Sequence, residues 1–224
     1  MEKIDSGSPM KILIIAATYN EIKPLLMASD LMPLQNDNLY SYHDHTIKIL
    51  ITGIGMVSTA YQMGRTFTNE HFDLALNVGI AGSFKQEIPI GSVMNVVEDR
   101  FSEIGFEEGN TITSFKEFGV NAVVKNLFLF KHKSLSGLQQ VKGITVNTVH
   151  GNAASIEKIK QFFNPDVESM EGAAFLFACN EEKVPCVQIR SISNFVEERN
   201  KSLWNIAIAV ENLNKALIKL LDSI

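Results

Sequence analysis

Short apolar runs alternate along this chain with segments whose apolar residues recur three or four positions apart. The run "KILIIAA" (11–17) is short and rich in β-branched residues, which is typical of a strand buried on both faces. The segment "LWNIAIAVENLNKALIKLL" has the apolar stripe of an amphipathic helix. The pattern predicts strands at 11–17, 45–55, 73–83, 91–99, 141–152 and 184–193, and helices at 21–29, 56–67, 154–163, 170–182 and 203–221.

This alternation of strands and helices predicts an α/β fold, a three-layer αβα sandwich with a central mixed, largely parallel sheet. Residues 10–224 are expected to form a single domain, preceded by a disordered leader or tag remnant at 1–9. Asn20 is expected to cap the first helix. The pattern is weak between 101 and 133, where glycines interrupt polar segments, and this stretch is expected to be an extended loop.

Four predicted strands end in small or polar residues. These ends are at 18–21, 53–55, 79–82 and 193–194. Ligands of parallel α/β sheets bind at the carboxyl ends of the strands. The glycines at two of these ends do not have the spacing of a dinucleotide or P-loop site. They are either structural turns or places where the backbone approaches a flat base or a sugar.

Composition and charge exclude several classes of function. The net charge is −5, from 20 basic and 25 acidic residues without a basic block, so a nucleic-acid partner is not expected. No apolar run is long enough to span a membrane, and the start does not resemble a secretory signal, so a cytoplasmic protein is expected. Cys179 and Cys186 lie in apolar runs and are expected to be buried free thiols.

No cofactor or metal is implied. The five histidines lack metal-ligand spacing and are expected to be surface or structural residues, with His150 set apart because it ends a predicted strand beside Gly151.

Glu21 allows two interpretations. As an acid in the first turn of a helix it would favour the helix dipole. As a carboxylate at the open edge of the sheet it could take a proton from water. Glu168 and Glu171, in "VESMEGAA", are similarly either capping acids or a site in which Glu171 binds vicinal sugar hydroxyls and Met170 packs on the sugar.

The order of the motifs gives a family resemblance. "KILIIAATYNEIKPL", "GIGMVSTA", "NVGIAG", "IPIGSVMNVVE", "VESMEGAA" and "VPCVQIRSISN" follow one another as in the nucleoside phosphorylase/nucleosidase superfamily, which the chain resembles over nearly all of 11–222. Within it, "ESMEGAA", "SISNFVEERN" and the downstream Trp204 look most like the futalosine hydrolase family, which releases hypoxanthine from futalosine in an alternative menaquinone pathway.

The resemblance implies a role for each candidate residue. Glu21 matches the general base for the attacking water, Glu171 the acid that binds ribose hydroxyls, and Met170 the residue stacked on ribose. Gly79, Ala81, Gly82 and Ser193 are expected to bind substrate. A homo-oligomer, a dimer or higher, is also implied.

Asn194 occupies the position that contacts the purine N7 edge in this family. Nucleosidases of methylthioadenosine and S-adenosylhomocysteine have aspartate there, which suits adenine. An asparagine amide can donate to O6 and N7, so Asn194 favours a 6-oxopurine. Arg199 is the first candidate to bind the benzoate carboxylate of futalosine, and Arg100 is the second. Alternatively, Arg199 is a surface residue that pairs with Glu197 or Glu198.

Three alternatives remain. They are the adenine-directed nucleosidase, a catalytically inert nucleoside-binding protein, and a phosphorolytic enzyme. The last would need arginines gathered around a phosphate, and the sequence near Gly53 and Gly79 contains none.

Overall fold

The computed structural model describes residues 8–28, 30–35, 38–109, 111–113, 115, 119 and 121–224. The longer strands are β1 (Lys11–Ala16), β4 (His45–Ile51), β5 (Leu74–Ser83), β6 (Val93–Arg100), β10 (Gln139–Thr145) and β12 (Cys186–Phe195). The shorter ones are β2 (Leu31–Pro33), β3 (Leu39–Tyr42), β7 (Phe106–Glu108), β8 (Thr111–Thr113), β9 (Val123–Lys125) and β11 (Val167–Ser169). The α-helices are α1 (Tyr19–Leu26), α2 (Met56–Asn69), α3 (Ala153–Phe163), α4 (Gly172–Glu182) and α5 (Ile206–Leu221), and the 3₁₀ turns are η2 (Lys133–Leu135) and η3 (Lys201–Leu203).

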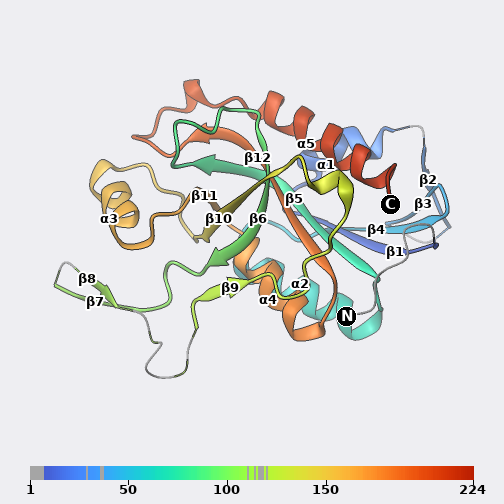
Figure 1. Ribbon diagram of the computed structural model, residues 1–224, viewed down its shortest axis with the longest axis horizontal. Helices are drawn as coiled ribbons and strands as arrows, with labels where there is room; N and C mark the ends of the chain where they lie inside the picture. Colours follow the sequence, from blue (N-terminus) through green and yellow to red (C-terminus); the bar gives the residue numbers. More distant parts are fainter. Residues whose placement is uncertain are drawn as a thin grey trace.

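Helices cover a central sheet on two sides, so the expected three-layer α/β architecture is confirmed (Figure 1). The strand order is β11-β10-β6-β12-β5-β1-β4-β3-β2, with β9 paired to β6. Five of these pairings are parallel: β1 with β4, β1 with β5, β5 with β12, β10 with β6, and β10 with β11. β11 also pairs antiparallel with β5, which closes five strands into a ring.

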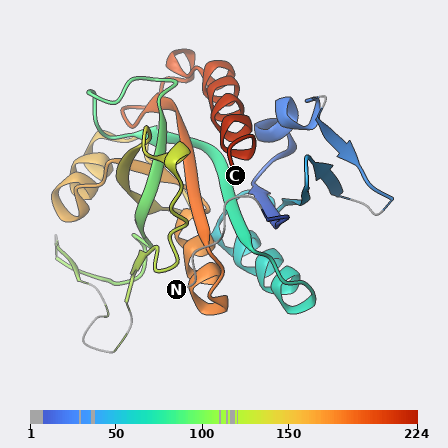
Figure 2. The ribbon, with the colours of Figure 1, turned by 45° about the vertical axis from the view of Figure 1, so that its right-hand side comes forward.

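The apolar run of β1 supplies two separate cores. Ile12, Ile14 and Ala16 pack in a cluster with residues of α1 and α5, whereas Leu13 and Ile15 pack with residues of α2 and α4. Successive strand residues point to opposite faces, so a strand buried on both sides must be apolar throughout. Figure 2 shows α5 on one side of the sheet and α2 with α4 on the other.

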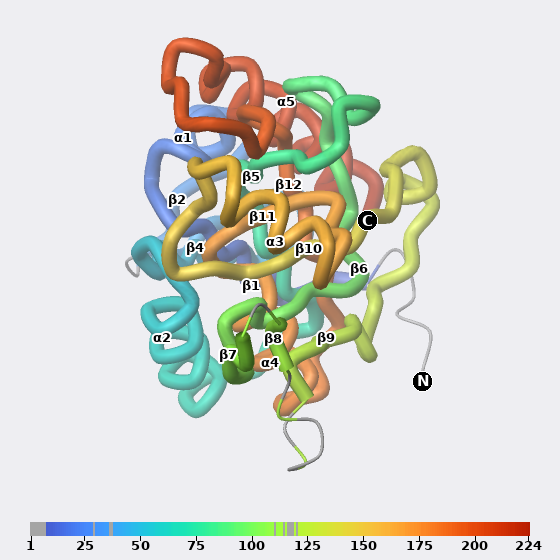
Figure 3. Tube along the Cα trace, turned by 90° about the vertical axis from the view of Figure 1, so that its left-hand side faces the viewer, coloured from blue at the N-terminus to red at the C-terminus, as the bar shows by residue number. Residues whose placement is uncertain are grey.

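Three local predictions need correction. Thr18, not Asn20, caps α1, since its side chain and that of Glu21 form a capping box. The helix ends at Leu26, before the expected end at Ser29, which lies outside the described residues. The stretch expected to be an extended loop contains β7, β8 and β9, and Figure 3 shows them at the end of the molecule opposite α1 and α5.

Two other findings concern the cysteines and the character of the helices. Cys179 and Cys186 are buried and free, as expected. In the part of the chain that the structure describes, no helix has the length and apolar character needed to cross a membrane.

Candidate active site

A fully buried arginine, Arg190, is at the centre of the candidate site. It lies on β12 opposite Gly79 of β5. Its Nη2 donates to Asn77 Oδ1, and its Nη1 lies 3.7 Å from Glu171 Oε2. Nη1 and Nε have no hydrogen-bond partner among the described residues. Buried polar groups are normally hydrogen-bonded, so Nη1 is available to a polar group bound beside Glu171.

Glu21 reaches the same place from the junction of β1 and α1. Its Oε2 accepts hydrogen bonds from the Thr18 backbone N–H (2.8 Å) and hydroxyl (3.0 Å), while its Oε1 accepts from the Ile80 N–H (3.2 Å). The side chain is 8% exposed. Glu21 therefore caps its helix and also places a carboxylate oxygen at the end of β5, and its role as a base stays a prediction.

The absence of a side chain at Gly79 allows these groups to meet. A Cβ at Gly79 would lie 2.2 Å from Arg190 Nη1 and 2.9 Å from Glu21 Oε1. Both atoms therefore lie over the same point of β5. Gly79 therefore allows the side chains of Arg190 and Glu21 to approach β5 closely, and its expected contact with substrate stays a prediction.

Glu171 stands at the N-cap position of α4, but its side chain makes no capping hydrogen bond. Its Oε1 instead accepts from the Gly55 N–H (3.1 Å), at the start of α2. Glu168 accepts from His150 and also does not cap α4. The capping interpretation of these two acids is therefore wrong, and Glu171 is a buried carboxylate beside Arg190.

Asn194 and Ser193 lie where β12 bulges against β5. The register shifts between Ile192 and Asn194, and bulges often redirect side chains at functional sites. The Asn194 Oδ1 accepts from the Ser193 hydroxyl (2.8 Å), and its Nδ2 donates to the Phe195 carbonyl (2.9 Å). These bonds fix the amide and leave a second N–H on Nδ2. Gly82 makes room, since a Cβ there would lie 3.2 Å from Nδ2.

The other predicted residues are placed less directly. Ala81 packs its methyl group in the core, and its carbonyl oxygen lies 3.3 Å from the Ser193 hydroxyl oxygen, whose single hydrogen is closer to Asn194 Oδ1. Met170 is half-buried against the cluster that contains Phe84 and Val146. Their roles toward substrate stay predictions.

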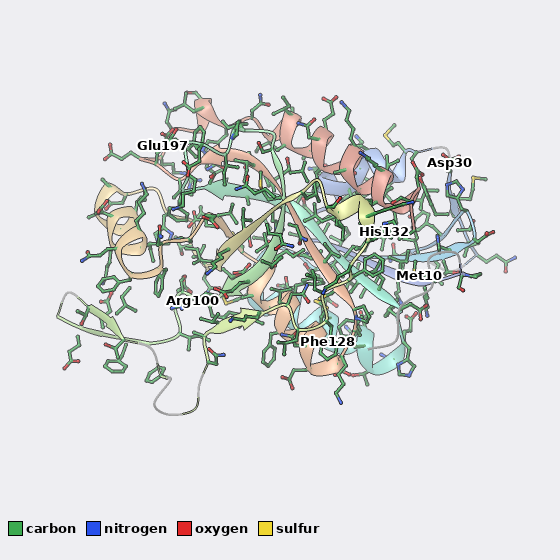
Figure 4. The ribbon with its side chains drawn as sticks, in the orientation of Figure 1. Met10, Asp30, Arg100, Phe128, His132 and Glu197 are labelled. Atoms are coloured by element: carbon green, nitrogen blue, oxygen red, sulfur yellow. The ribbon has the colours of Figure 1, made fainter. Side chains whose placement is uncertain are left out.

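The two arginines expected near a substrate carboxylate are far from each other. Arg199 is exposed, with its guanidinium carbon 5.3 Å from the centre of the Trp204 ring. Arg100 has its guanidinium carbon 5.1 Å from the centre of the Phe163 ring. Figure 4 shows Arg100 at the end of β6, away from the loop that carries Glu197. The ion pairs found in the described part of the chain do not include Arg199.

A buried hydrogen-bond network joins β6, β10, β12 and the start of α4. Asp99 accepts from Gln188 Nε2 (3.0 Å) and from the Thr145 hydroxyl (2.9 Å), and Thr145 accepts from the Ala173 N–H at the start of α4 (2.7 Å). A Cβ at Gly172 would lie 2.1 Å from Asp99 Oδ2, so Asp99 can approach the start of α4 this closely only because residue 172 is glycine. Burial raises the pKa of Asp99 to about 6, against the lowering effect of these hydrogen bonds.

Sequence reasoning missed Arg190 and Asn77. The expectation that no arginine lies near Gly79 is wrong, because β12 places Arg190 directly opposite it. Both residues interrupt otherwise apolar strands, "VPCVQIRSIS" and "LALNVGIAG". A charged side chain inside a strand that is buried on both faces requires a polar partner. The arginine within the apolar run of β12 was therefore the signal in the sequence that could have identified Arg190 as a site residue.

Comparisons with known proteins show the family of the chain. The family model described as the Phosphorylase superfamily matches residues 11–222. The aminodeoxyfutalosine nucleosidase of Campylobacter jejuni is 29% identical over 206 residues, covering 85% of this chain and 88% of that protein. The futalosine hydrolase of Thermus thermophilus is 27% identical over 180 residues, covering 77% and 80%.

One solved structure shows the shared fold. A Helicobacter pylori nucleosidase mutant with 5'-methylthioadenosine in its active site has a TM-score of 0.79 and 19% identity, covering 97% of this chain and all of that one.

Proposed function

This chain belongs to the Phosphorylase superfamily, and from that premise we propose that it hydrolyses the N-ribosidic bond of futalosine and releases hypoxanthine. At the coarser level it is a nucleosidase, an N-glycosyl hydrolase, as its relatives indicate. The finer assignment rests on one observation, the fixed amide of Asn194 at the end of β12. By the family resemblance, the reaction would serve the alternative menaquinone pathway.

Glu21 and Glu171 have separate tasks in this proposal. Cleavage develops positive charge on the ribose, and a water attacks the anomeric carbon. Glu21 takes a proton from that water, and the unpartnered Arg190 Nη1 binds the water or a ribose hydroxyl between the two carboxylates. Glu171, held by the Gly55 N–H, accepts hydrogen bonds from the ribose hydroxyls.

Asn194 selects the base. Its Nδ2 uses one N–H on the Phe195 carbonyl and keeps the other, and this second N–H is the donor that it offers to a ligand. The O6 and N7 atoms of hypoxanthine are both acceptors, whereas adenine presents a donor at its 6-amino group. Hydrolysis of an adenine nucleoside, such as aminodeoxyfutalosine or methylthioadenosine, is the alternative, and names of similar proteins support it.

The charged side chains around Gly79 disfavour phosphorolysis. Arg190 is the cation next to Gly79, and it faces the carboxylates of Glu21 and Glu171. A phosphate placed there would meet two carboxylates and one guanidinium, without the further arginines that an anion site needs.

The experiment is a measurement of free base released from futalosine, aminodeoxyfutalosine, inosine and methylthioadenosine in phosphate-free buffer. We expect the largest kcat/KM for futalosine, and we expect Glu21→Gln to lower kcat about 10²- to 10⁴-fold. Faster turnover of aminodeoxyfutalosine than of futalosine would overturn the substrate assignment. Release only after phosphate is added would overturn the hydrolytic reaction.

A further inference from the structure

The first turn of α4 is capped by a residue of another strand and not by Glu171, its own N-cap residue. An N-cap side chain normally accepts a hydrogen bond from the backbone N–H of the second or third helical residue. In α4 the second residue is Ala173, and its N–H donates to the Thr145 hydroxyl of β10 (2.7 Å). The Gly172 N–H donates to Ser169 Oγ (3.3 Å). Both N–H groups that follow Glu171 in the chain therefore have partners without it.

Asp99 fixes the direction of the hydrogen bonds at Thr145. An ionised carboxylate only accepts, and the Thr145 hydroxyl has a single hydrogen, which it donates to Asp99 Oδ1 (2.9 Å). The lone pairs of the hydroxyl are therefore left to accept from the Ala173 N–H. Thr145 and Asp99 are 0% and 1% exposed, so bulk water does not compete for these bonds.

Two glycines and Gln188 hold Asp99 in place. A Cβ at Gly172 would lie 2.1 Å from both Asp99 Oδ2 and Gln188 Nε2, and a Cβ at Gly143 of β10 would lie 2.8 Å from Asp99 Oδ2. Gln188 comes two residues before Arg190 in β12, so the two side chains project from the same face of the sheet. The network therefore connects the start of α4 to the strand that carries Arg190.

This arrangement leaves the Glu171 side chain to the candidate site, where Oε1 accepts from the Gly55 N–H (3.1 Å) and Oε2 lies 3.7 Å from Arg190 Nη1. Without the Thr145 hydroxyl, the Ala173 N–H would be a buried donor that lacks a partner, which is costly. The first turn of α4 would then shift, or the Glu171 carboxylate would turn back to cap it. Either change moves that carboxylate relative to Arg190.

We propose that Thr145 is a positioning residue of the reaction, which caps α4 in place of Glu171 and so keeps the Glu171 carboxylate at the ribose. Asp99 orients the Thr145 hydroxyl for this task. Thr145 does not touch the substrate and acts through Glu171. The inference rests on the proposed nucleosidase function, in which Glu171 accepts hydrogen bonds from the ribose hydroxyls.

The test isolates the hydroxyl group. Thr145→Ser keeps the hydroxyl and loses the methyl group, whereas Thr145→Ala loses both, so the two variants differ by the hydroxyl alone. The measurement is kcat/KM for base release from whichever of the four nucleosides named above the unaltered protein cleaves fastest. A displacement of about 1 Å can cost about 10²-fold in rate, so we expect kcat/KM in Thr145→Ala to be about 10- to 100-fold below that in Thr145→Ser.

A second threonine provides the control. The Thr66 hydroxyl donates to the Gln62 carbonyl within α2 (2.8 Å), so Thr66→Ala removes a hydroxyl that does not cap another helix and should keep the full rate. Thermal unfolding of each variant establishes that the assayed protein is folded. If Thr145→Ala does not fold, Thr145→Val takes its place, because it also removes the hydroxyl and fills the space with a methyl group.

A double-mutant cycle with Glu171→Gln separates positioning from a general loss of structure. If Thr145 acts through the Glu171 carboxylate, its hydroxyl should matter little once that carboxylate is gone. Thr145→Ala should therefore lower kcat/KM by no more than about 2-fold in the Glu171→Gln background.

The outcomes are separable. Equal losses from Thr145→Ala in the two backgrounds would make its role merely structural, and equal rates in Thr145→Ala and Thr145→Ser would remove the hydroxyl from the reaction. Either result would overturn the inference. Release of base from none of the four nucleosides by the unaltered protein would instead overturn the proposed function.

Discussion

Gly79→Ala perturbs the candidate site with a single methyl group. The added Cβ would lie 2.2 Å from Arg190 Nη1 and 2.9 Å from Glu21 Oε1, where an ordinary contact is 3.4 Å or more. Arg190 would have to retreat by about 1 Å, and a displacement of this size can cost about 10²-fold in rate. Overpacking of this kind costs about 1–3 kcal/mol of the free energy of unfolding, so the variant is expected to fold.

The assay measures kcat for base release together with the free energy of unfolding in denaturant. Gly64→Ala is the matched control, because a Cβ there has no neighbour within 4 Å and Gly64 lies inside α2. It should retain full activity and gain about 0.5–1 kcal/mol of stability. If Gly79→Ala kept the kcat of the unaltered protein, the convergence of Arg190 and Glu21 over Gly79 would not be the catalytic arrangement.

Three further predictions concern neighbouring residues. The pKa of Asp99 is raised from 3.8 to about 6, so its contribution to stability is complete below pH 3.8 and is lost as pH rises to about 6. Between these two pH values, the free energy of unfolding measured in denaturant should fall by up to about 3 kcal/mol more in the unaltered protein than in Asp99→Asn. Parallel curves of unfolding free energy against pH for the two proteins would refute this. Asn194→Asp should lower the ratio of futalosine to aminodeoxyfutalosine turnover about 10- to 100-fold, and an unchanged ratio would remove Asn194 from base selection. Arg199→Ala should raise KM about 10-fold for futalosine and little for inosine, and equal effects would place the carboxylate elsewhere.

The sequence was sufficient to predict the layers of the fold because periodicity is a local property. The continuous apolar run at 11–17 forms the strand β1, and the segment with helical spacing at 203–221 contains the helix α5. Strands of three residues, such as β7 and β8, are too short to show a period of two, so no pattern identified them. The pairing of β11 with β5 joins residues far apart in the sequence, and neither segment contains a local signal for it.

The position of the candidate site was predictable where it follows from strand ends. Glu21, Gly79 and Asn194 lie at or just beyond the carboxyl halves of β1, β5 and β12, and these strands pair in parallel. Arg190 was not found, because its importance comes from Asn77 and Glu171, which only the folded chain brings to it. The capping interpretation of Glu171 was wrong for the same reason, since its partner is the distant Gly55 N–H.

The central claim is hydrolysis of a 6-oxopurine nucleoside by water that Glu21 activates. It is tested most directly by turnover of futalosine in phosphate-free, ¹⁸O-labelled water, with mass analysis of both products. The account predicts unlabelled hypoxanthine and a ribosyl product carrying one ¹⁸O at its anomeric carbon, with the rate strongly reduced by Glu21→Gln. A ribosyl product formed only with phosphate, or unaffected turnover in Glu21→Gln, would contradict it.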